Sequence, residues 1–226
     1  KPDALDTVYR CMQPSVRITL DEVVELPPVS VPPVIEVPLS PEQDKTYKAL
    51  KRLFLAHIQG QKITALNAAV LVGKLLQVAG GWVYDDERGV VSFTCPERIQ
   101  TVMDLIESTQ RKVILLVPYL HMLAGLEKAL IAEKVDVATV RKDNIDLLLH
   151  DFQNTPKYKV LLSHPKRISH GLTLTAANMN IWWLPTGSHD DFEQTNCRIR
   201  RVGQEHKQYI YRIGGTAVEN RMYQNL

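Results

Sequence analysis

The sequence predicts an α/β protein built on a parallel sheet of about five strands with flanking helices. From residue 111 onward, short apolar runs alternate with amphipathic segments, which is the rhythm of strands joined by crossover helices. The run 113–117 is continuously apolar, as in strands that a parallel sheet buries on both faces. Polar connections rich in basic residues follow the later runs, and ligands of such sheets bind beyond the strand carboxyl ends. The expected strands are 113–117, 135–140, 160–163, 179–184 and 208–213.

The first forty residues have the composition of a tether. Prolines stand at positions 27, 28, 32, 33, 38 and 41, and proline fixes φ and lacks an N–H donor, so no helix can run through this stretch. The alternating segment 34–37 can still form an edge strand. Ser40, with Pro41 at the first helical position and Gln43 at the capping-box position, begins a helix that extends to about Ile58.

The next seventy residues read as helices around one hairpin. A helical pattern over 63–79 stops at Gly80-Gly81, and two β-rich runs, 82–84 and 90–93, flank a turn. A further helix spans 96–108. The apolar side chains expected on the first helix are Tyr47, Leu50, Leu53 and Phe54, and Leu50, Phe54, Leu75 and Leu76 are assigned to the core.

Later helices are expected at 121–133, 144–152, 190–200 and 216–225, and a loop at 166–173. The predicted organisation is a proline-rich tether over 1–40, a helical segment with a hairpin over 41–110 that packs on the lobe, and an α/β lobe over 111–226. The segment 41–110 can instead belong to the linker.

Composition excludes several classes of protein. The chain has 226 residues, 45% hydrophobic and 23% charged, which is ordinary for a globular protein. No apolar run approaches the ~20 residues that span a bilayer. No signal peptide is visible, and residue 1 is Lys, so we expect a fragment or a processed chain from a cytoplasmic protein. The three cysteines form neither a disulfide framework nor a zinc motif.

Charge is concentrated in one stretch. The whole chain carries a net charge of +2, yet 194–212 holds five cations against one anion. Arg198 and Arg201 stand three residues apart in a helix expected to end at Gly203, so they would share a face with Gln194. Two such guanidinium groups suit a phosphate. The alternative is a solvated basic helix end favoured by the helix dipole, and the residues alone leave the two readings about even.

Four motifs resemble one family. The pattern QxxxRxxRxGQ from Gln194 to Gln204 resembles motif VI of the Snf-type branch of superfamily-two helicases and translocases. The segments 161–163 and 170–178 resemble motif V, 112–118 resembles motif IV, and 26–47 resembles the segment joining the two lobes. The sequence around Ser163-His164-Pro165 is most similar to those of phage and prophage members. The resemblance covers nearly the whole chain.

The resemblance implies the second, C-terminal RecA-like lobe of an ATP-dependent DNA helicase or translocase. Arg198 and Arg201 would then be arginine fingers at an ATP site completed by an N-terminal lobe of the same polypeptide. It assigns nucleotide contacts to Gln194, Gly171, Arg198, Arg201 and Gln204. It assigns DNA contacts to Ser163, His164, Lys166, Arg167, His170 and Thr173.

Departures from the family pattern fall in the loops. Thr173 stands where the family usually has Asn, Lys166 and Arg167 stand where small residues are usual, and Gly187 stands where an aromatic is common. They concern the fine geometry of these loops. Lys166 and Arg167 are either additional phosphate contacts or ordinary solvated loop charges.

The residues of a complete ATPase are missing. The only Gly-Lys pair, Gly73-Lys74, lies in a predicted helix with Ala68 where the phosphate loop needs glycine. The acidic run 85–87 lies at a hairpin tip. ATP and Mg²⁺ would therefore be bound mainly by the missing lobe, and the isolated chain, expected to be a monomer with no metal and no membrane partner, would not hydrolyse ATP. The alternatives are a stand-alone nucleic-acid-binding or adaptor module, and a structural remnant that binds neither ligand.

Three weaker features have two readings each. His189-Asp190-Asp191 is either a metal or base site or the start of a helix with acids in its first turn, and the helix start is favoured. Trp182-Trp183 is either a base-stacking platform or core, with at least one ring expected inward. Cys197 is either a reactive thiol beside cations or structural, and the structural reading is favoured.

Overall fold

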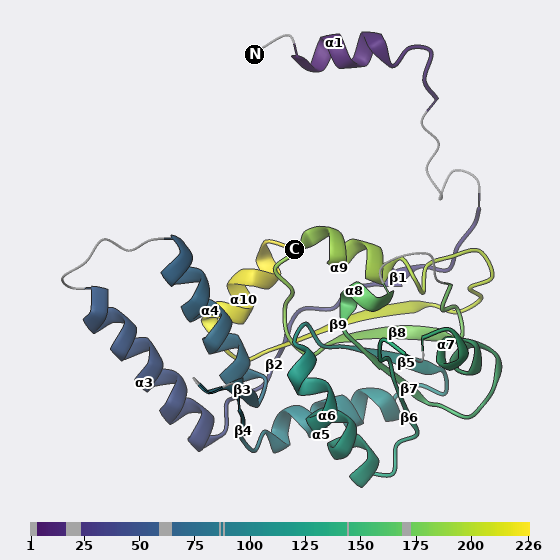
Figure 1. Cartoon of the computed structure of the whole chain (residues 1–226). Helices are drawn as coiled ribbons and strands as arrows, with labels where there is room; N and C mark the ends of the chain where they lie inside the picture. Colours follow the sequence, from purple (N-terminus) through teal and green to yellow (C-terminus); the bar gives the residue numbers. More distant parts are fainter. Residues whose placement is uncertain are drawn as a thin grey trace.

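A parallel sheet forms the centre of the computed structural model, which describes residues 4–16, 24–58, 65–85, 87, 89–143, 145–168 and 173–226 (Figure 1). The strand order is β1-β9-β8-β5-β7-β6, and β2 also pairs with β9, all in parallel. The strands are β1 (Val29–Ser30), β2 (Ile35–Glu36), β5 (Lys112–Leu116), β6 (Val137–Thr139), β7 (Val160–Ser163), β8 (Ala177–Trp182) and β9 (Gln208–Gly214). The predicted α/β class is confirmed, and the five expected strands are β5 to β9.

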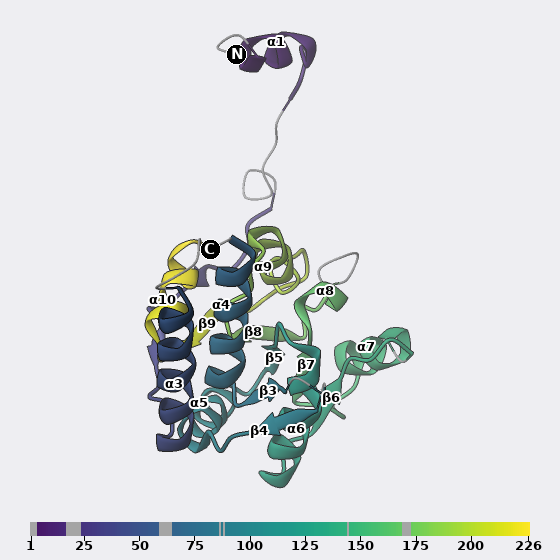
Figure 2. The same ribbon diagram turned by 60° about the vertical axis from the view of Figure 1, so that its left-hand side comes forward.

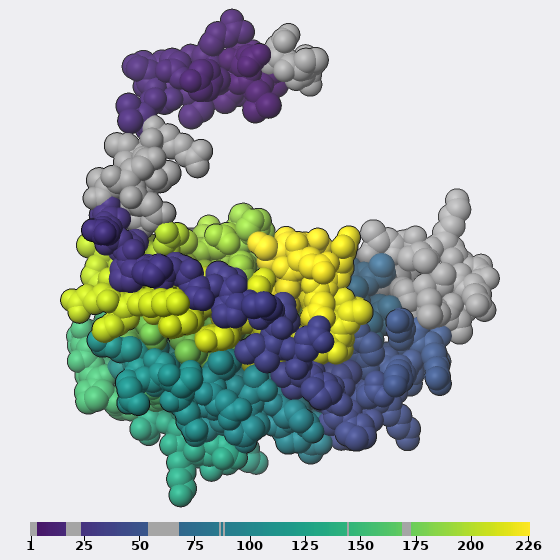
Figure 3. Space-filling model, turned by 180° about the vertical axis from the view of Figure 1, so that it is seen from behind, coloured from purple at the N-terminus to yellow at the C-terminus, as the bar shows by residue number. Residues whose placement is uncertain are grey.

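The proline-rich stretch adds two strands of two residues each to the five expected strands. The segment 24–40 lies along β9 across one side of the molecule (Figure 3). Proline lacks an N–H but keeps its carbonyl, so this segment suits a sheet edge. The N–H of Gln208 donates to the carbonyl of Pro28 at 3.0 Å, and the N–H of Val37 donates to that of Gly214 at 2.7 Å. The edge strand expected within 34–37 is β2.

The helical segment follows the predicted order. Its elements are α3 (Pro41–Ile58), α4 (Ala65–Ala79), β3 (Trp82–Tyr84), β4 (Val90–Ser92) and α5 (Pro96–Glu107), with α3 and α4 side by side in Figures 1 and 2. The capping box is present, since the N–H of Ser40 donates to Oε1 of Gln43 at 3.0 Å and the N–H of Gln43 donates to Oγ of Ser40 at 3.4 Å. Leu75 and Leu76 are buried as expected, whereas Leu53 is 69% exposed. The side chain of Phe54 lies outside the described part.

Two hydrophobic cores cover the two faces of the sheet. Successive side chains of β5 belong to different cores: Leu115 lies in one and Ile114 in the other. Trp183 joins the first core and Trp182 the second, and both side chains are fully buried. The reading of this pair as a base-stacking platform is therefore wrong for both rings. The remaining helices are α1 (Ala4–Cys11), α6 (Leu120–Ala132), α7 (Ile145–Asn154), α8 (Pro165–Ile168), α9 (His189–Asn196) and α10 (Ala217–Gln224).

A buried ion pair ties α5 to the carboxyl side of the sheet. Nη2 of Arg98 lies 2.6 Å from Oε1 of Glu219 on α10, and Nη1 donates to the carbonyl of Trp183 at 2.8 Å. The other Glu219 oxygen accepts from Gly215 N–H and from the Thr216 hydroxyl. The helical segment is thus fixed to the lobe by a desolvated, fully hydrogen-bonded charge pair. Within the described ranges, every helix is too short or too polar to cross a bilayer.

Candidate nucleotide and nucleic-acid interface

The sheet has a topological switch point beside its central strand, β5. From β5 the chain leaves through α6 towards β6, whereas from β8, the neighbour of β5, it leaves through α9 towards β9 on the other side. Connections that diverge in this way leave a crevice at the strand carboxyl ends, where α/β proteins bind ligands. The first candidate site is therefore defined by chain topology.

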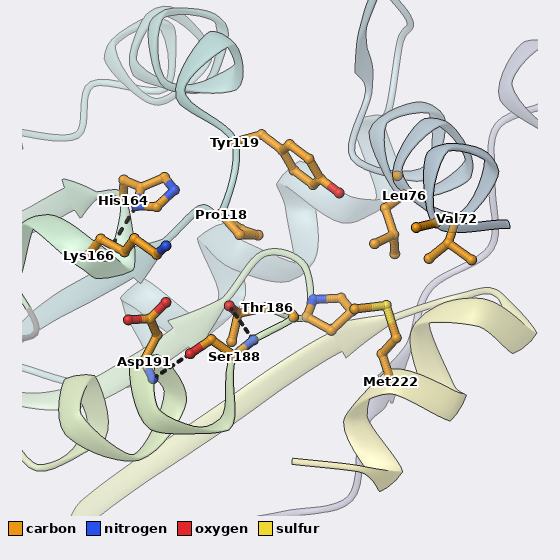
Figure 4. A pocket seen from close by; sticks show the side chains of 14 residues that line it. Val72, Leu76, Pro118, Tyr119, His164, Lys166, Thr186, Ser188, Asp191 and Met222 are labelled. Carbon is orange, nitrogen blue, oxygen red and sulfur yellow. Dashed lines mark hydrogen bonds between the residues drawn. The ribbon is translucent and has the colours of Figure 1, made fainter. Parts of the chain in front are cut away.

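A cleft of about 490 Å³ occupies this position (Figure 4). One wall is polar and comes from the connections that follow β5, β7 and β8. The opposite wall is apolar and comes from α4 and α10. The polar wall includes Tyr119, His164, Lys166, Thr186, Ser188 and Asp191, and the apolar wall includes Val72, Leu76 and Met222.

His164 joins two of these connections. Its Nδ1 accepts the N–H of Lys166 at 3.2 Å, so the ring proton of the neutral imidazole lies on Nε2. The ring also hydrogen-bonds the carbonyl of Pro118. Burial is the largest cause that lowers the pKa of His164, and the nearby Arg167 and Lys166 lower it further, while the Pro118 bond and Asp191 oppose them. His164 is therefore a neutral, positioning side chain at pH 7.

The other residues to which the resemblance assigns DNA contacts differ in the solvent exposure of their side chains. Ser163 is fully buried, and its hydroxyl donates to the carbonyl of His164 at 3.0 Å. Lys166 is exposed, whereas Arg167 donates through Nη1 to the carbonyl of Val140. The loop expected over 166–173 begins as the short helix α8, because Pro165 starts a helical turn. Thr173 is exposed, and His170 and Gly171 lie outside the described residues.

The arginine segment is a turn rather than the helix expected over 190–200. Helix α9 begins where predicted, with Ser188 as its N-cap accepting Asp191 N–H at 3.1 Å, which supports the structural reading of the acidic run. It ends at Asn196, because Thr195 and Asn196 are poor helix formers. Arg198 and Arg201 therefore do not share a helical face.

The turn nevertheless places the two arginines near each other. Arg198 is 6% exposed, and its Nε donates to the carbonyl of Gln194 at 3.0 Å. Burial first, and then the charge of Arg201, lowers the pKa of Arg198. A bound anion would relieve that like-charge repulsion. Gly203, with φ of 93°, stands third in a turn closed by Gln204 N–H and the Arg201 carbonyl at 3.0 Å.

Gln204 joins this turn to the connection that follows α8. Its Nε2 donates to the carbonyls of Ala177 at 2.9 Å and Ile199 at 3.0 Å, with a longer bond to Thr175 at 3.4 Å. It is 5% exposed, so its amide supports the two segments from inside. Gln194, by contrast, is exposed on α9. Cys197 is exposed too.

Sequence reasoning missed much of the cleft. Tyr119 and Thr186 each follow a buried strand, which is a usable signal because their connections meet at one sheet edge. The contribution of Val72 and Leu76 had no such signal, because α4 reaches the cleft only through tertiary packing. Among the described residues, no group of three or more His, Cys, Asp or Glu side chains has the arrangement of a metal site.

Comparison with known proteins gives relatives by sequence and by fold. No family model matches the chain. Putative protein p41 of Acyrthosiphon pisum secondary endosymbiont phage 1 is 30% identical over 176 residues, covering 75% of this chain and 35% of that protein. The uncharacterized ATP-dependent helicase MG018 of Mycoplasma genitalium is 27% identical over 221 residues, covering 92% of this chain and 21% of that protein. The chain thus spans about a third and about a fifth of these relatives.

Solved structures define the class of fold. The C-terminal part of the Fun30 ATPase domain superposes with a TM-score of 0.71 at 15% identity, covering 88% of this chain and 90% of that one. The Sulfolobus solfataricus SWI2/SNF2 ATPase core in complex with dsDNA gives 0.68 at 19% identity, covering 87% of this chain and 43% of that one. The chain has a RecA-like α/β fold. It resembles, more particularly, the C-terminal lobe of Snf-type superfamily-two ATPases, as its motifs predicted.

Proposed function

We propose that the chain is the C-terminal motor lobe of an ATP-dependent DNA helicase or translocase. The observation that carries the proposal is the direct bond between the two segments that resemble motifs V and VI, where the N–H of Leu174 donates to the carbonyl of Arg198 at 3.0 Å. In the proposed motor, a change of position at the arginine turn would reach the connection that precedes β8 through this bond. A hydrogen-bonded connection of this kind suits a lobe that converts ATP binding into movement on DNA.

The nucleotide side of the proposal rests on Arg198 and Arg201 as arginine fingers. Each guanidinium keeps its charge and presents a planar fork of donors to phosphate oxygens, which stabilises the charge of a phosphoryl group in transfer. Gln194 and Gly171 would complete the contacts, and Gln204 would act by positioning the turn. Burial of Arg198 before any nucleotide arrives reduces the ordering needed on binding.

ATP and Mg²⁺ would be bound mainly by an N-terminal lobe of the same polypeptide. The Gly73-Lys74 pair of this chain lies inside α4, and the Lys74 ammonium donates to the carbonyl of Tyr84, so it is not a phosphate loop. The isolated chain is therefore proposed to be inactive. The division into a tether over 1–40, a helical segment over 41–110 and a lobe over 111–226 remains part of this proposal.

The DNA side of the proposal lies at the carboxyl ends of β7 and β8. Lys166 is exposed beside the cleft and would contact a phosphate directly, with Thr173 and His170 from the following connection. Ser163, His164 and Arg167 bond to neighbouring backbone and would hold this edge in shape. The proposal is supported by the solved structure of similar fold that is in complex with dsDNA.

The test is steady-state phosphate release with DNA present, measured for the isolated chain and for the longer protein that contains it. We expect the longer protein to hydrolyse ATP and the isolated chain not to. Robust ATP hydrolysis by these 226 residues alone would overturn the shared-site model. Salt-dependent DNA binding without turnover by the longer protein would favour the alternative, a nucleic-acid-binding or adaptor module.

A further inference from the structure

The cleft at the switch point has two chemically different walls. Figure 4 shows His164, Lys166 and Asp191 on one side of it and Val72 and Leu76 on the other. Its volume of about 490 Å³ lies within the ~300–1,000 Å³ of small-molecule sites. A ligand that fills it is therefore expected to combine a charged or hydrogen-bonding part with an apolar part.

Tyr119 stands between the two walls. In Figure 4 its side chain comes from the connection after β5 and extends towards α4, with the hydroxyl nearest Leu76. Burial raises the pKa of this hydroxyl to about 12, so the ring remains neutral. A neutral aromatic ring beside aliphatic side chains is the surface on which an unstacked nucleobase packs.

The polar wall supplies groups for the rest of a nucleotide. Lys166 is exposed at the rim and provides a cation for a phosphate. Thr186 and Asp191, which follow β8, provide a hydroxyl and a carboxylate, and carboxylates accept hydrogen bonds from the exocyclic amino groups of bases. The negative charge of Asp191 also directs the phosphate towards Lys166 rather than deep into the cleft.

We propose that this cleft holds an unstacked nucleobase of single-stranded DNA, packed on Tyr119 and the apolar wall of α4 and α10, with its phosphate at Lys166. The inference rests on the proposed function, and it adds to that function a contact with a base. Unstacking costs least in a single strand. Because every base has an aromatic face, the contact would tolerate many sequences and prefer bases with an amino group.

Gly73 offers a way to fill the cleft without disturbing the fold. It lines the cleft from α4, and a Cβ added there meets no atom within 4 Å. Gly73→Phe is therefore expected to direct its ring towards the space assigned to the base. Val70→Phe is the matched control, since Val70 lies on the same helix, is 58% exposed and does not line the cleft.

The experiment uses an oligonucleotide with 2-aminopurine at an interior position, whose fluorescence rises when the base leaves its neighbours. Binding by the chain and by Val70→Phe should raise the fluorescence, and Gly73→Phe should abolish the rise. Tyr119→Ala should weaken affinity roughly tenfold, in line with loss of one base-stacking contact. Lys166→Ala should weaken affinity and reduce its salt dependence without abolishing the rise in fluorescence.

Fluorescence anisotropy of an end-labelled strand separates the two levels of the proposal. Binding by anisotropy with no 2-aminopurine response would overturn the base pocket and leave the motor proposal standing. A response that Gly73→Phe leaves intact would also overturn it, and would favour a protein side chain as the occupant of the cleft. Failure of the strand to bind at all would overturn the base pocket, whereas the motor proposal is tested separately by DNA-stimulated turnover of the longer protein.

Discussion

The backbone N–H of Leu174 donates to the carbonyl oxygen of Arg198 at 3.0 Å, so the connection before β8 and the turn after α9 are one hydrogen-bonded unit. The two segments are 24 positions apart in the numbering of the sequence and are joined again by the side chain of Gln204. This unit gives the proposed motor lobe a physical link between its nucleotide side and its DNA side.

Gln204→Leu should lower the free energy of unfolding by about 1–3 kcal/mol. The substitution keeps the approximate shape of the side chain but leaves the carbonyls of Ala177 and Ile199 without their buried donor. Urea denaturation measures the change. Gln194→Leu is the control, because Gln194 is exposed and should change stability by less than about 0.5 kcal/mol. Equal effects of the two substitutions would refute the supporting role of Gln204.

Arg98→Met should cost about 3–5 kcal/mol, because it leaves the carboxylate of Glu219 buried without its cation. The double variant Arg98→Met with Glu219→Leu should recover part of that loss, since the uncompensated charge is gone. Chemical denaturation of both variants gives the comparison. A double variant at least as unstable as Arg98→Met would show that Glu219 matters through its hydrogen bonds to Gly215 and Thr216 instead.

Two glycines in helices should respond to alanine in opposite directions. A Cβ at Gly125 of α6 would lie 2.3 Å from the ring of Trp82, so Gly125→Ala should destabilise the fold by about 1–3 kcal/mol. At Gly73 of α4 the space is open, and Gly73→Ala should stabilise by about 0.5–1 kcal/mol. Thermal unfolding of the two variants measures both effects. Stabilisation by both substitutions would contradict the packing of α6 against β3.

Acidification should weaken the fold through His164 and His121. Burial lowers the pKa of each below 6.5 in the folded protein; Lys74 lowers the pKa of His121 further, while its hydrogen bond to the carbonyl of Trp82 opposes the shift. Between the folded-state pKa values and pH 6.5, the unfolded chain therefore binds more protons than the folded chain. The stability contribution is complete above pH 6.5 and is lost as the pH falls through the folded-state pKa values.

Denaturation midpoints between pH 7.5 and pH 5.5 measure this effect. The double variant His164→Gln with His121→Gln should show a flatter decline than the native sequence, because the remaining groups titrate in both. Parallel declines would mean that these imidazoles are as easily protonated in the folded state as in the unfolded state.

Much of the fold was predictable because local signals agreed with tertiary packing. The apolar run in β5, the capping box of Ser40 and Gln43, and the glycine stop after α4 each specify structure within a few residues. Pairing of β1 and β2 with β9 was less accessible, because it joins residues about 180 positions apart through carbonyls that proline leaves available.

The candidate site was predictable in residue type but not in geometry. Motif spacing predicted that Arg198 and Arg201 lie together on one helical face. Because α9 ends at Asn196, they lie together on a turn instead. Both tryptophans of the 182–183 pair are buried because helices cover both faces of β8, which alternation alone does not reveal. The apolar wall of the cleft depends on where α4 packs, which is a purely tertiary property.

In the proposed motor, Arg201 acts on the transferred phosphate of ATP bound by a neighbouring lobe. The most direct measurement is DNA-stimulated ATP turnover of the longer protein, native and with Arg201→Ala, beside Arg221→Ala as an exposed control on α10. We expect Arg201→Ala to lower turnover by a factor of about 10³–10⁵ and Arg221→Ala to keep native turnover. Near-native turnover of Arg201→Ala would contradict this role of Arg201.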